Sequence, residues 1–386
     1  MSIKGKAFIA GAYEHPDRNI PDKSIAQVHA ELALGALADA GLSLSDVDGL
    51  LGAGDSPGFG NISMADYLGL KHLSYVDSTE TGGSSYVAHV GHASALIAAG
   101  KCSICLITLA GLPRQPSGGG RLPAGPEGAF EQSFGPNTVS MYALAARRHM
   151  HEYGTTSEQL AAIKVAASHH AQYNSHAFLQ NVVTIEEVLD SPVISNPLHR
   201  LDCCVITDGG GALVVVSPEV ARDLERNCAK VLGHGESPKH SMNGKIDLTY
   251  TGAVWSGPRA FEEAGVTQGD IDYVSIYDSF TITVLETIED LGFCKKGEGG
   301  AFVADGALEA PNGALPFNTD GGGLCNNHPA NRGGMTKVIE AVRQVRGEAN
   351  PQVQVPDCEI VLAHGTGGSL GTRMGSATVI LGREDA

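Results

Sequence analysis

Four short segments of the chain carry polar side chains among glycines, a pattern typical of loops that bind substrates. They are residues 77–85 (DSTETGGSS), 277–280 (YDSF), 318–329 (NTDGGGLCNNHP) and 363–369 (AHGTGGS). Glycine permits tight turns and lets the backbone approach a ligand closely. Loops held on a rigid scaffold commonly carry catalytic side chains. We therefore expect these four segments to meet at one site.

Two histidines and a tyrosine in these segments are the strongest candidates for acid–base chemistry. His328 and His364 each lie in a polar, glycine-flanked turn at a predicted strand end, and Tyr277 directly follows a predicted strand. An imidazole or a phenol held in such a turn can move a proton or stabilise a developing oxyanion.

The candidates for a nucleophile, Ser84, Ser85 and Cys325, are less well supported than the candidates for acid–base chemistry. Residues 77–85 lead into an apolar helix that ends at Gly100, and a helix N-terminus stabilises an anion. Ser84 or Ser85 is expected to cap this helix rather than to attack a substrate. Cys325, three residues before His328, is a candidate thiol nucleophile, although a packing role is the commoner one for such a cysteine.

An internal duplication supplies the elements that must position these residues. Residues 7–16 align with 229–238, 36–50 with 260–274, 102–111 with 358–367, and 210–219 with 375–384. Four weak matches in the same order predict two similar halves. Each half alternates strands with helices and closes with a hairpin, which predicts a largely parallel sheet covered by helices. The halves are expected to stack about a pseudo-dyad, with helices buried between the sheets.

The first half contains an inserted segment, which we place at residues 112–199. It opens with a glycine- and proline-rich loop. Helices are predicted from Pro136 to Tyr153, and from a Thr155–Glu158 capping box to about Ala171. The N-terminal half then comprises residues 1–111 and 200–225, and the C-terminal half residues 229–386. A helical insertion over two α/β halves is expected to shape a ligand site.

Composition restricts the class of protein. The net charge of −17 argues against a nucleic-acid surface, although a few local arginines could still hold a polyanionic ligand. The absence of an 18-residue apolar stretch argues against a membrane span. Met1 leads directly into a strand-like run, and eight cysteines in a long chain with no leader segment are typical of a reduced cytoplasmic enzyme.

The cysteines and histidines do not predict a metal site. Cys102 and Cys105 form a CxxC, but within an apolar run that indicates a buried strand. The spacings of the pairs His149/His151 and His169/His170 put their side chains on different helix faces.

Taken together, these segments resemble the thiolase superfamily, specifically its sterol-carrier-protein type, the lipid-transfer-protein-like branch. The likeness is strongest over residues 196–219, 276–293, 318–334 and 365–368. It implies an α/β fold of duplicated halves in a five-layered α-β-α-β-α arrangement with an inserted helical loop subdomain. It also implies a homodimer or tetramer, a coenzyme A thioester as substrate with no covalently bound cofactor, and in some cases a small zinc-ribbon OB-fold partner protein.

The chain departs from this family's catalytic pattern. The resemblance implies a nucleophilic cysteine at the start of the buried helix, a second cysteine in the last glycine loop, and an asparagine and a histidine in an oxyanion hole. These positions fall on Gly82, His364, Tyr277 and His328, so only the histidine is retained. Glycine has no side chain to acylate. What remains is a pocket at His328 that can polarise a thioester. We expect its substrate- and oxyanion-binding residues to be Gly82, Gly83, Ser84, Asp278, Asn318 and Gly367.

The primary hypothesis is therefore carbon–carbon bond chemistry next to a thioester without an acyl-enzyme, such as the retro-aldol cleavage of a β-hydroxyacyl-CoA. Tyr277 or His364 would take the hydroxyl proton, and His328 would hold the enolate oxygen. Acyl transfer through Cys325 is one alternative, and a non-catalytic acyl-CoA- or lipid-binding subunit of a complex is another. Candidate coenzyme A contacts in the inserted segment are Arg114, Arg121, Arg147 and Arg148.

Overall fold

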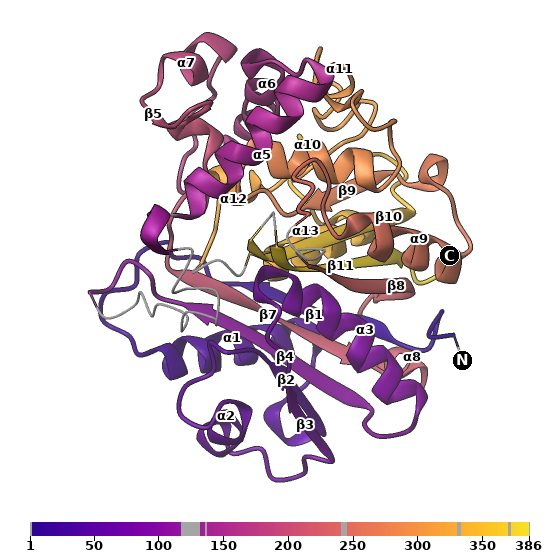
Figure 1. Ribbon diagram of the computed structural model, residues 1–386. Helices are drawn as coiled ribbons and strands as arrows, with labels where there is room; N and C mark the ends of the chain where they lie inside the picture. The colour runs from indigo at the N-terminus through magenta and orange to yellow at the C-terminus, as the bar shows by residue number, and fades with distance from the viewer. Residues whose placement is uncertain are drawn as a thin grey trace.

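A mixed nine-stranded sheet runs through the molecule (Figure 1). The computed structural model describes residues 2–116, 132–135, 137–240, 245–329, 333–369 and 372–385. Its strands are β1 (Phe8–Glu14), β2 (Gly49–Gly52), β3 (Tyr75–Ser78), β4 (Ile104–Gly111), β7 (Gly209–Val216), β8 (Ala229–Lys239), β9 (Tyr273–Ile276), β10 (Ile360–Ser369) and β11 (Thr372–Gly382). They are ordered β3-β2-β4-β7-β1-β8-β11-β10-β9, and β5 (Val193–Ser195) pairs separately with β6 (Leu198–His199).

The strand order confirms the duplication. The halves β3-β2-β4-β7-β1 and β9-β10-β11-β8 are joined where β1 pairs antiparallel with β8. In this pairing Phe8 lies opposite Lys230, the residue with which the internal repeat aligns it, so the pseudo-dyad passes through that pair. The counterpart of β3 in the second half is an isolated parallel bridge between Val274 and Phe317.

The expectation of a largely parallel sheet is wrong. Among the strands of the described residues, β2 with β3, β2 with β4, and β9 with β10 pair in parallel. The pairs β1–β7, β4–β7, β8–β11 and β10–β11 are antiparallel. The last two strands of each half pair antiparallel, β10 with β11 directly and β4 with β7 across the inserted segment, and the second of each pair then lies antiparallel to the first strand of its half. The antiparallel pairs therefore outnumber the parallel ones that strand–helix alternation predicts.

Helices cover the sheet in the predicted five layers. α3 (Ser85–Ala98) and α13 (Gly334–Arg346) contact strands of both halves and form the middle layer. α1 (Ile25–Ala40) packs on the outer face of β1, β4 and β7, and α9 (Ala253–Ala264) packs on β8 and β11. α10 (Thr281–Asp290) belongs to the same apolar cluster as α9. One apolar cluster fills the space between the two halves, and one lies beneath each outer layer.

The inserted segment stands over the C-terminal half (Figure 1). It contains α5 (Thr138–Tyr153), α6 (Ser157–Ala171) and α7 (Ile185–Asp190), and α6 contacts α10. The remaining helices are α2 (Asn61–Leu68), α8 (Pro218–Asp223), α11 (Gly299–Val303) and α12 (Gly322–Cys325). The boundaries of the segment at residues 112 and 199 remain a prediction.

Two predicted helix starts differ from the structure. α5 begins after Asn137, whose side chain accepts a hydrogen bond from Ser140 N; Pro136 lies outside the described residues. α6 is capped by Thr156 and not by Thr155. The hydroxyl of Thr155 is instead 2.8 Å from the Nδ1 of buried His149, so the next threonine caps the helix.

Candidate active site

Tyr277 and His328 lie in contact between the two halves of the chain. The Oη of Tyr277 is 2.8 Å from the Nε2 of His328, and both residues are buried. Burial lowers the pKa of His328 to about 4 and raises the pKa of Tyr277 well above its usual value. Both groups are therefore neutral near pH 7, and a neutral phenol next to a neutral imidazole can pass on one proton.

The head of the buried helix meets this pair through glycines. Gly82 and Gly83 lie in a 3₁₀ turn that leads into α3. A Cβ at Gly83 would be 2.4 Å from Cε2 of Tyr277 and 2.4 Å from the carbonyl oxygen of Thr366. A Cβ at Gly82, whose φ is +67°, would be 2.8 Å from the Cα of Gly367. The close approach of the three segments therefore requires glycine at both positions.

The serines at the head of α3 do not cap the helix. Ser84 Oγ donates to the carbonyl oxygen of Thr81 at 2.8 Å, and Ser85 Oγ accepts from Thr81 N at 2.8 Å. Both hydroxyls thus close the preceding turn. Gly82 N donates to Oε1 of Glu80 at 2.9 Å.

Asp278, the residue after Tyr277, anchors the next loop. Its carboxylate accepts from Gly323 N at 2.8 Å and Leu324 N at 3.0 Å. It also forms a 2.9 Å ion pair with Lys337 Nζ, and both side chains are buried. Although burial alone would lower the pKa of Lys337, the neighbouring carboxylates, Asp278 first, hold it above its usual value. A charged pair thus lies buried beside His328.

Sequence analysis missed Lys337. α13 carries Lys337, Glu340 and Gln344 at helical spacings of three and four, and all three are buried. Such a stripe of polar residues beside an apolar face was the available signal.

His364 lies on the other side of its strand from Tyr277. Its backbone oxygen accepts from Tyr277 N at 2.9 Å, but its Nδ1 is 2.8 Å from the Oγ1 of Thr378, which in turn contacts Ser256 of α9. The next residue, Gly365, faces Ser84 in the middle layer, and successive strand residues face opposite sides. Burial lowers the pKa of His364 to about 3, so this imidazole is neutral.

Cys325 and Asn318 have contacts of their own. The Sγ of Cys325 is 3.0 Å from the Nζ of Lys164 on α6, and burial raises the pKa of the thiol despite this cation. The Asn318 side chain is bonded to both the N and the O of Ile276 at 2.8 Å. Cys325 therefore faces the inserted segment, and Asn318 fixes the start of its loop.

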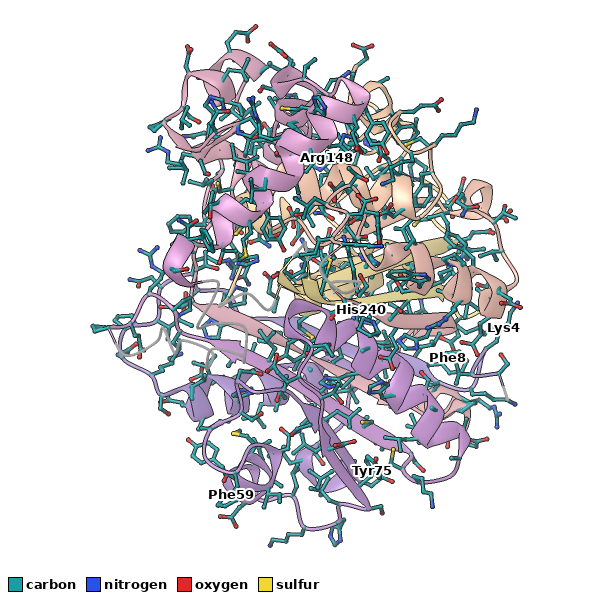
Figure 2. All side chains as sticks on the ribbon, in the orientation of Figure 1. Lys4, Phe8, Phe59, Tyr75, Arg148 and His240 are labelled. Carbon is teal, nitrogen blue, oxygen red and sulfur yellow. The ribbon has the colours of Figure 1, made fainter. Side chains whose placement is uncertain are left out.

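The four candidate arginines are not gathered at one place. Arg114 donates to the carbonyl oxygen of Ile206 and lies over the ring of Phe178. Arg147 and Arg148 are exposed on α5, where Figure 2 labels Arg148. Arg121 lies outside the described residues.

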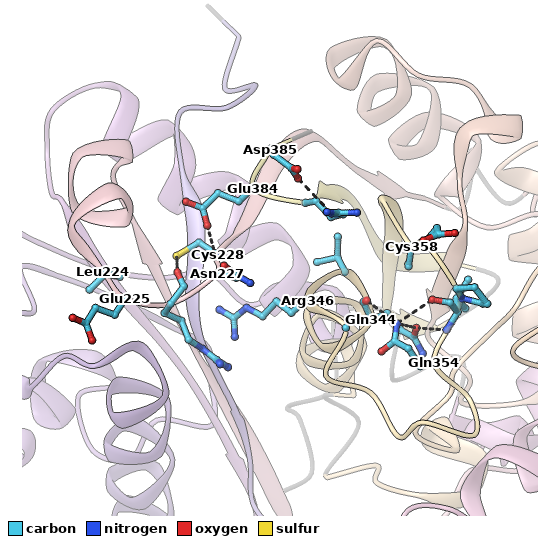
Figure 3. A pocket seen from close by; sticks show the side chains of 17 residues that line it. Leu224, Glu225, Asn227, Cys228, Gln344, Arg346, Gln354, Cys358, Glu384 and Asp385 are labelled. Atoms are coloured by element: carbon cyan, nitrogen blue, oxygen red, sulfur yellow. Dashed lines mark hydrogen bonds and ion pairs between the residues drawn. The ribbon is translucent and has the colours of Figure 1, made fainter.

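A cavity of about 780 Å³ lies elsewhere, where the connection from β7 to β8, the end of α13 and the last described residues meet (Figure 3). Arg226 and Arg346 line it, and both are ion-paired with Asp39. None of its lining residues belongs to the four glycine-lined segments, so we assign it no part in the chemistry.

Three further expectations concern a metal site, the cysteine pair Cys102 and Cys105, and a membrane-spanning helix. No group of three or more His, Cys, Asp or Glu residues in these ranges has the arrangement of a metal site. Cys102 and Cys105 are free and buried; Cys105 lies on β4, as predicted, whereas Cys102 precedes that strand by two residues. No described helix is both long enough and apolar enough to cross a membrane.

Comparison with known proteins shows relatives over nearly the whole chain. A family model described as "Thiolase C-terminal domain-like" matches residues 235–383. The "Steroid side-chain-cleaving aldolase" of Thermomonospora curvata is 36% identical over 362 residues, which are 89% of this chain and 91% of that protein. The "17-hydroxy-3-oxo-4-pregnene-20-carboxyl-CoA lyase" of Mycobacterium tuberculosis is 34% identical over 95% of this chain and 97% of that one.

A solved structure, the "Ltp2-ChsH2(DUF35) aldolase", covers 99% of both chains with a TM-score of 0.90 and 34% identity. The five-layered fold and these relatives define a thiolase-like enzyme. The chain belongs to the thiolase superfamily, in its sterol-carrier-protein-like branch.

Proposed function

We propose that this enzyme cleaves a β-hydroxyacyl-CoA by a retro-aldol reaction, without forming an acyl-enzyme. The observation that carries the proposal is the 2.8 Å contact between Tyr277 Oη and His328 Nε2 at the head of α3, where Gly82 leaves no nucleophilic side chain. A buried, neutral proton-transfer pair without a nucleophile suits the breaking of a carbon–carbon bond through an enolate.

The reaction needs one proton to leave the substrate and one to return. The β-hydroxyl gives its proton to Tyr277 while Tyr277 passes its own to His328. The Cα–Cβ bond then breaks, its electron pair forms the thioester enolate, and the β-carbon leaves as a ketone or aldehyde. The His328 imidazolium lies beside the enolate charge. Its proton returns through Tyr277 to the enolate carbon, which yields the shortened acyl-CoA and restores both residues.

Tyr277 rather than His364 receives the hydroxyl proton in this scheme. The imidazole of His364 contacts Thr378 on the α9 side of the sheet, while the ring of Tyr277 adjoins Gly83. The alternative of acyl transfer through Cys325 is disfavoured, because its thiol is buried against Lys164 and its pKa is raised.

Three features of the enzyme's setting extend the proposal. The names of the relatives support a bulky β-hydroxyacyl-CoA, such as a steroid thioester, as the substrate class. The DUF35 component of the similar solved structure supports a small partner protein of the zinc-ribbon and OB-fold kind. The eight free cysteines support a reducing, cytoplasmic setting.

We also propose a homodimer formed through β3. This strand ends the sheet, and Val76 on it is 40% exposed. Phe59, Ile62 and Tyr67 add exposed apolar surface next to it, and Figure 2 shows Phe59 and Tyr75 at this end of the molecule. An open edge strand is a ready template for pairing, and the same edge on a second copy would satisfy it about a two-fold axis.

The direct test is turnover of β-hydroxyacyl-CoA and β-ketoacyl-CoA panels by the purified chain, with and without a DUF35-type partner. We expect release of a ketone or aldehyde from β-hydroxyacyl-CoA, and a loss of about 100-fold or more in kcat in the His328→Ala variant. Unaltered turnover by His328→Ala would remove the proposal. Tight binding of acyl-CoA without turnover in both arms would indicate the non-catalytic subunit.

A further inference from the structure

The end of β1 supplies a buried carboxylate, Glu14, to the loop that carries His328. Glu14 Oε1 accepts from Arg18 Nη2 at 2.9 Å, Asn326 Nδ2 at 3.2 Å and Asn327 Nδ2 at 2.9 Å. Its other oxygen lies 3.4 Å from Arg343 Nη1. Although burial alone would raise the pKa of Glu14, Arg18 and Arg343 hold it below its usual value. The carboxylate is thus ionised and surrounded by donors.

A chain of hydrogen bonds continues from this carboxylate to His328. The amide of Asn327 that donates to Glu14 also accepts, through its Oδ1, from Thr207 Oγ1 at 2.8 Å. The same hydroxyl accepts from the backbone N of His328 at 2.8 Å. The Asn327 amide and the Thr207 hydroxyl therefore each donate one hydrogen bond and accept one, which fixes the orientation of both.

The neighbouring asparagine makes the same connection by a second route. Asn326 donates to Glu14 and to Asp320, and its Oδ1 accepts from Arg18 at 2.7 Å. Both residues before His328 are thus held by a carboxylate from the other half of the chain. Within the described residues, this network reaches His328 at its backbone N, through the hydroxyl of Thr207.

We propose that Glu14 is a positioning residue that sets where His328 stands relative to Tyr277. The inference rests on the proposed function. It explains why a charged residue of the first half is buried against a loop of the second half, about 300 residues away in sequence. Since misplacing a reacting group by 1 Å can cost roughly 100-fold in rate, loosening this loop should lower turnover without weakening substrate binding.

The sharpest test exchanges the carboxylate of Glu14 with the amide of Asn327. Glu14→Gln removes the acceptor charge, and Asn327→Asp sets two carboxylates against each other. In the double variant the glutamine amide can donate to the aspartate, which restores the hydrogen bond with reversed polarity. We expect each single change to lower kcat about 100-fold with KM unchanged, and the double variant to recover at least about ten-fold. Asn327→Ala breaks the contact from the loop side and should match the single variants.

Glu348→Gln is the matched control. Glu348 lines the same 220 Å³ pocket as Glu14, but its ion pairs are with Arg226 and Arg346, so kcat should not change. Single variants with the parent kcat, or a double variant no better than the poorer single one, would overturn the inference.

Crystal structures of the parent and Glu14→Gln give a reading independent of activity. The Tyr277 Oη to His328 Nε2 distance should lengthen from 2.8 Å to beyond about 3.5 Å. An unchanged distance would overturn the positioning role. A parent protein without retro-aldol turnover would count against the proposed function alone.

Discussion

The Tyr277–His328 pair holds together two groups that burial keeps uncharged. A phenol with a raised pKa is a weak acid, and an imidazole with a lowered pKa is a weak base. The phenol can nevertheless pass its proton to the imidazole if it receives another from the substrate in the same step, because no phenolate then forms. The resulting imidazolium is a ready acid and returns the proton. At this scale the account depends on the Tyr277 hydroxyl, which can be removed without changing the ring.

Tyr277→Phe should lower kcat by about 10²- to 10⁴-fold, the usual contribution of a general acid–base group. The ring that adjoins Gly83 remains, so the melting temperature should move little. Steady-state kinetics on a β-hydroxyacyl-CoA, with calorimetry on the same sample, measure both. Turnover within a few-fold of the parent would exclude the phenol from the proton path.

Cys325→Ala should leave turnover within a few-fold of the parent. The thiol contacts Lys164 and lies in the apolar cluster beneath the inserted helices, so its loss creates only a small cavity. Intact-mass measurement after incubation with acyl-CoA should find no adduct on the parent chain. A thioester on Cys325 would restore the acyl-transfer alternative.

Glu340 makes stability depend on pH. Burial raises the pKa of Glu340 to about 7, although Arg343 opposes the shift. Between pH 4.5 and 7 the folded protein therefore holds this proton more tightly than the unfolded chain, and the free energy of unfolding falls as pH rises. Glu340→Gln keeps an acceptor for Thr319 Oγ1, which donates to Oε1, but cannot titrate.

The free energy of unfolding of the Glu340→Gln variant should therefore rise relative to that of the parent as pH rises. From pH 5 to pH 8 the difference in unfolding free energy should move in its favour by about 2–3 kcal/mol, at 1.36 kcal/mol per pKa unit. Denaturant melts at both pH values measure this. A pH-independent difference would mean that Glu340 does not titrate in this window.

At the scale of elements, the head of α3 decides which chemistry the fold can perform. Gly82 has a φ of +67°, and a Cβ at this position would be 2.8 Å from the Cα of Gly367 and 2.8 Å from the N of Gly368. A side chain there meets both backbone strain and a collision with β10. The missing nucleophile is therefore built into the way these two elements approach each other.

Gly82→Cys should not produce an acyl-enzyme. It should also destabilise the fold more than Gly100→Cys, since Gly100 has a φ of +66° but no atom within 4 Å of its Cβ position. We expect the Gly100→Cys variant to lose about 1–2 kcal/mol of unfolding free energy from conformational strain alone. The Gly82→Cys variant should lose about 1–3 kcal/mol more because its side chain collides with β10. Equal losses of unfolding free energy in the two variants, measured by denaturant melts, would show that β10 does not exclude a side chain at residue 82. An acyl adduct on the Gly82→Cys variant would show the same.

The sequence predicted these elements better than it predicted the side-chain directions. The repeat predicted a duplicated fold, and the glycine-lined segments contain Tyr277 and His328, which the structure brings into contact; their catalytic roles stay predictions. The face to which His364 points depends on strand register, because a shift of one residue reverses every side chain, and glycines on either side give no alternation from which to read it. Lys337 belongs to a stripe of polar residues on α13 that the sequence does show, whereas Glu14 acts through contacts between distant parts of the chain, which no local pattern encodes.

At the scale of the whole molecule, β3 is the exposed edge that remains after the two halves have joined. A charged side chain on an edge strand opposes its pairing with a second chain. The Val76→Lys variant places such a charge on β3 and should therefore disrupt a dimer formed through this strand. We expect the parent to elute as a dimer and Val76→Lys as a monomer in size-exclusion chromatography with light scattering. Leu34→Lys, at a 52% exposed apolar position on α1, is the control and should remain dimeric. A dimeric Val76→Lys variant would place the interface elsewhere. A monomeric parent would exclude a homodimer.

A single-turnover experiment can show whether the carbon–carbon bond breaks without a covalent intermediate. The enzyme is mixed with a stoichiometric β-hydroxyacyl-CoA and quenched at intervals, and the masses of the intact protein and of the small molecules are measured by mass spectrometry. We expect the ketone or aldehyde and the shortened acyl-CoA to appear together while the mass of the protein never changes. A transient increase in protein mass by one acyl group, rising and falling on the time scale of product release, would contradict this expectation.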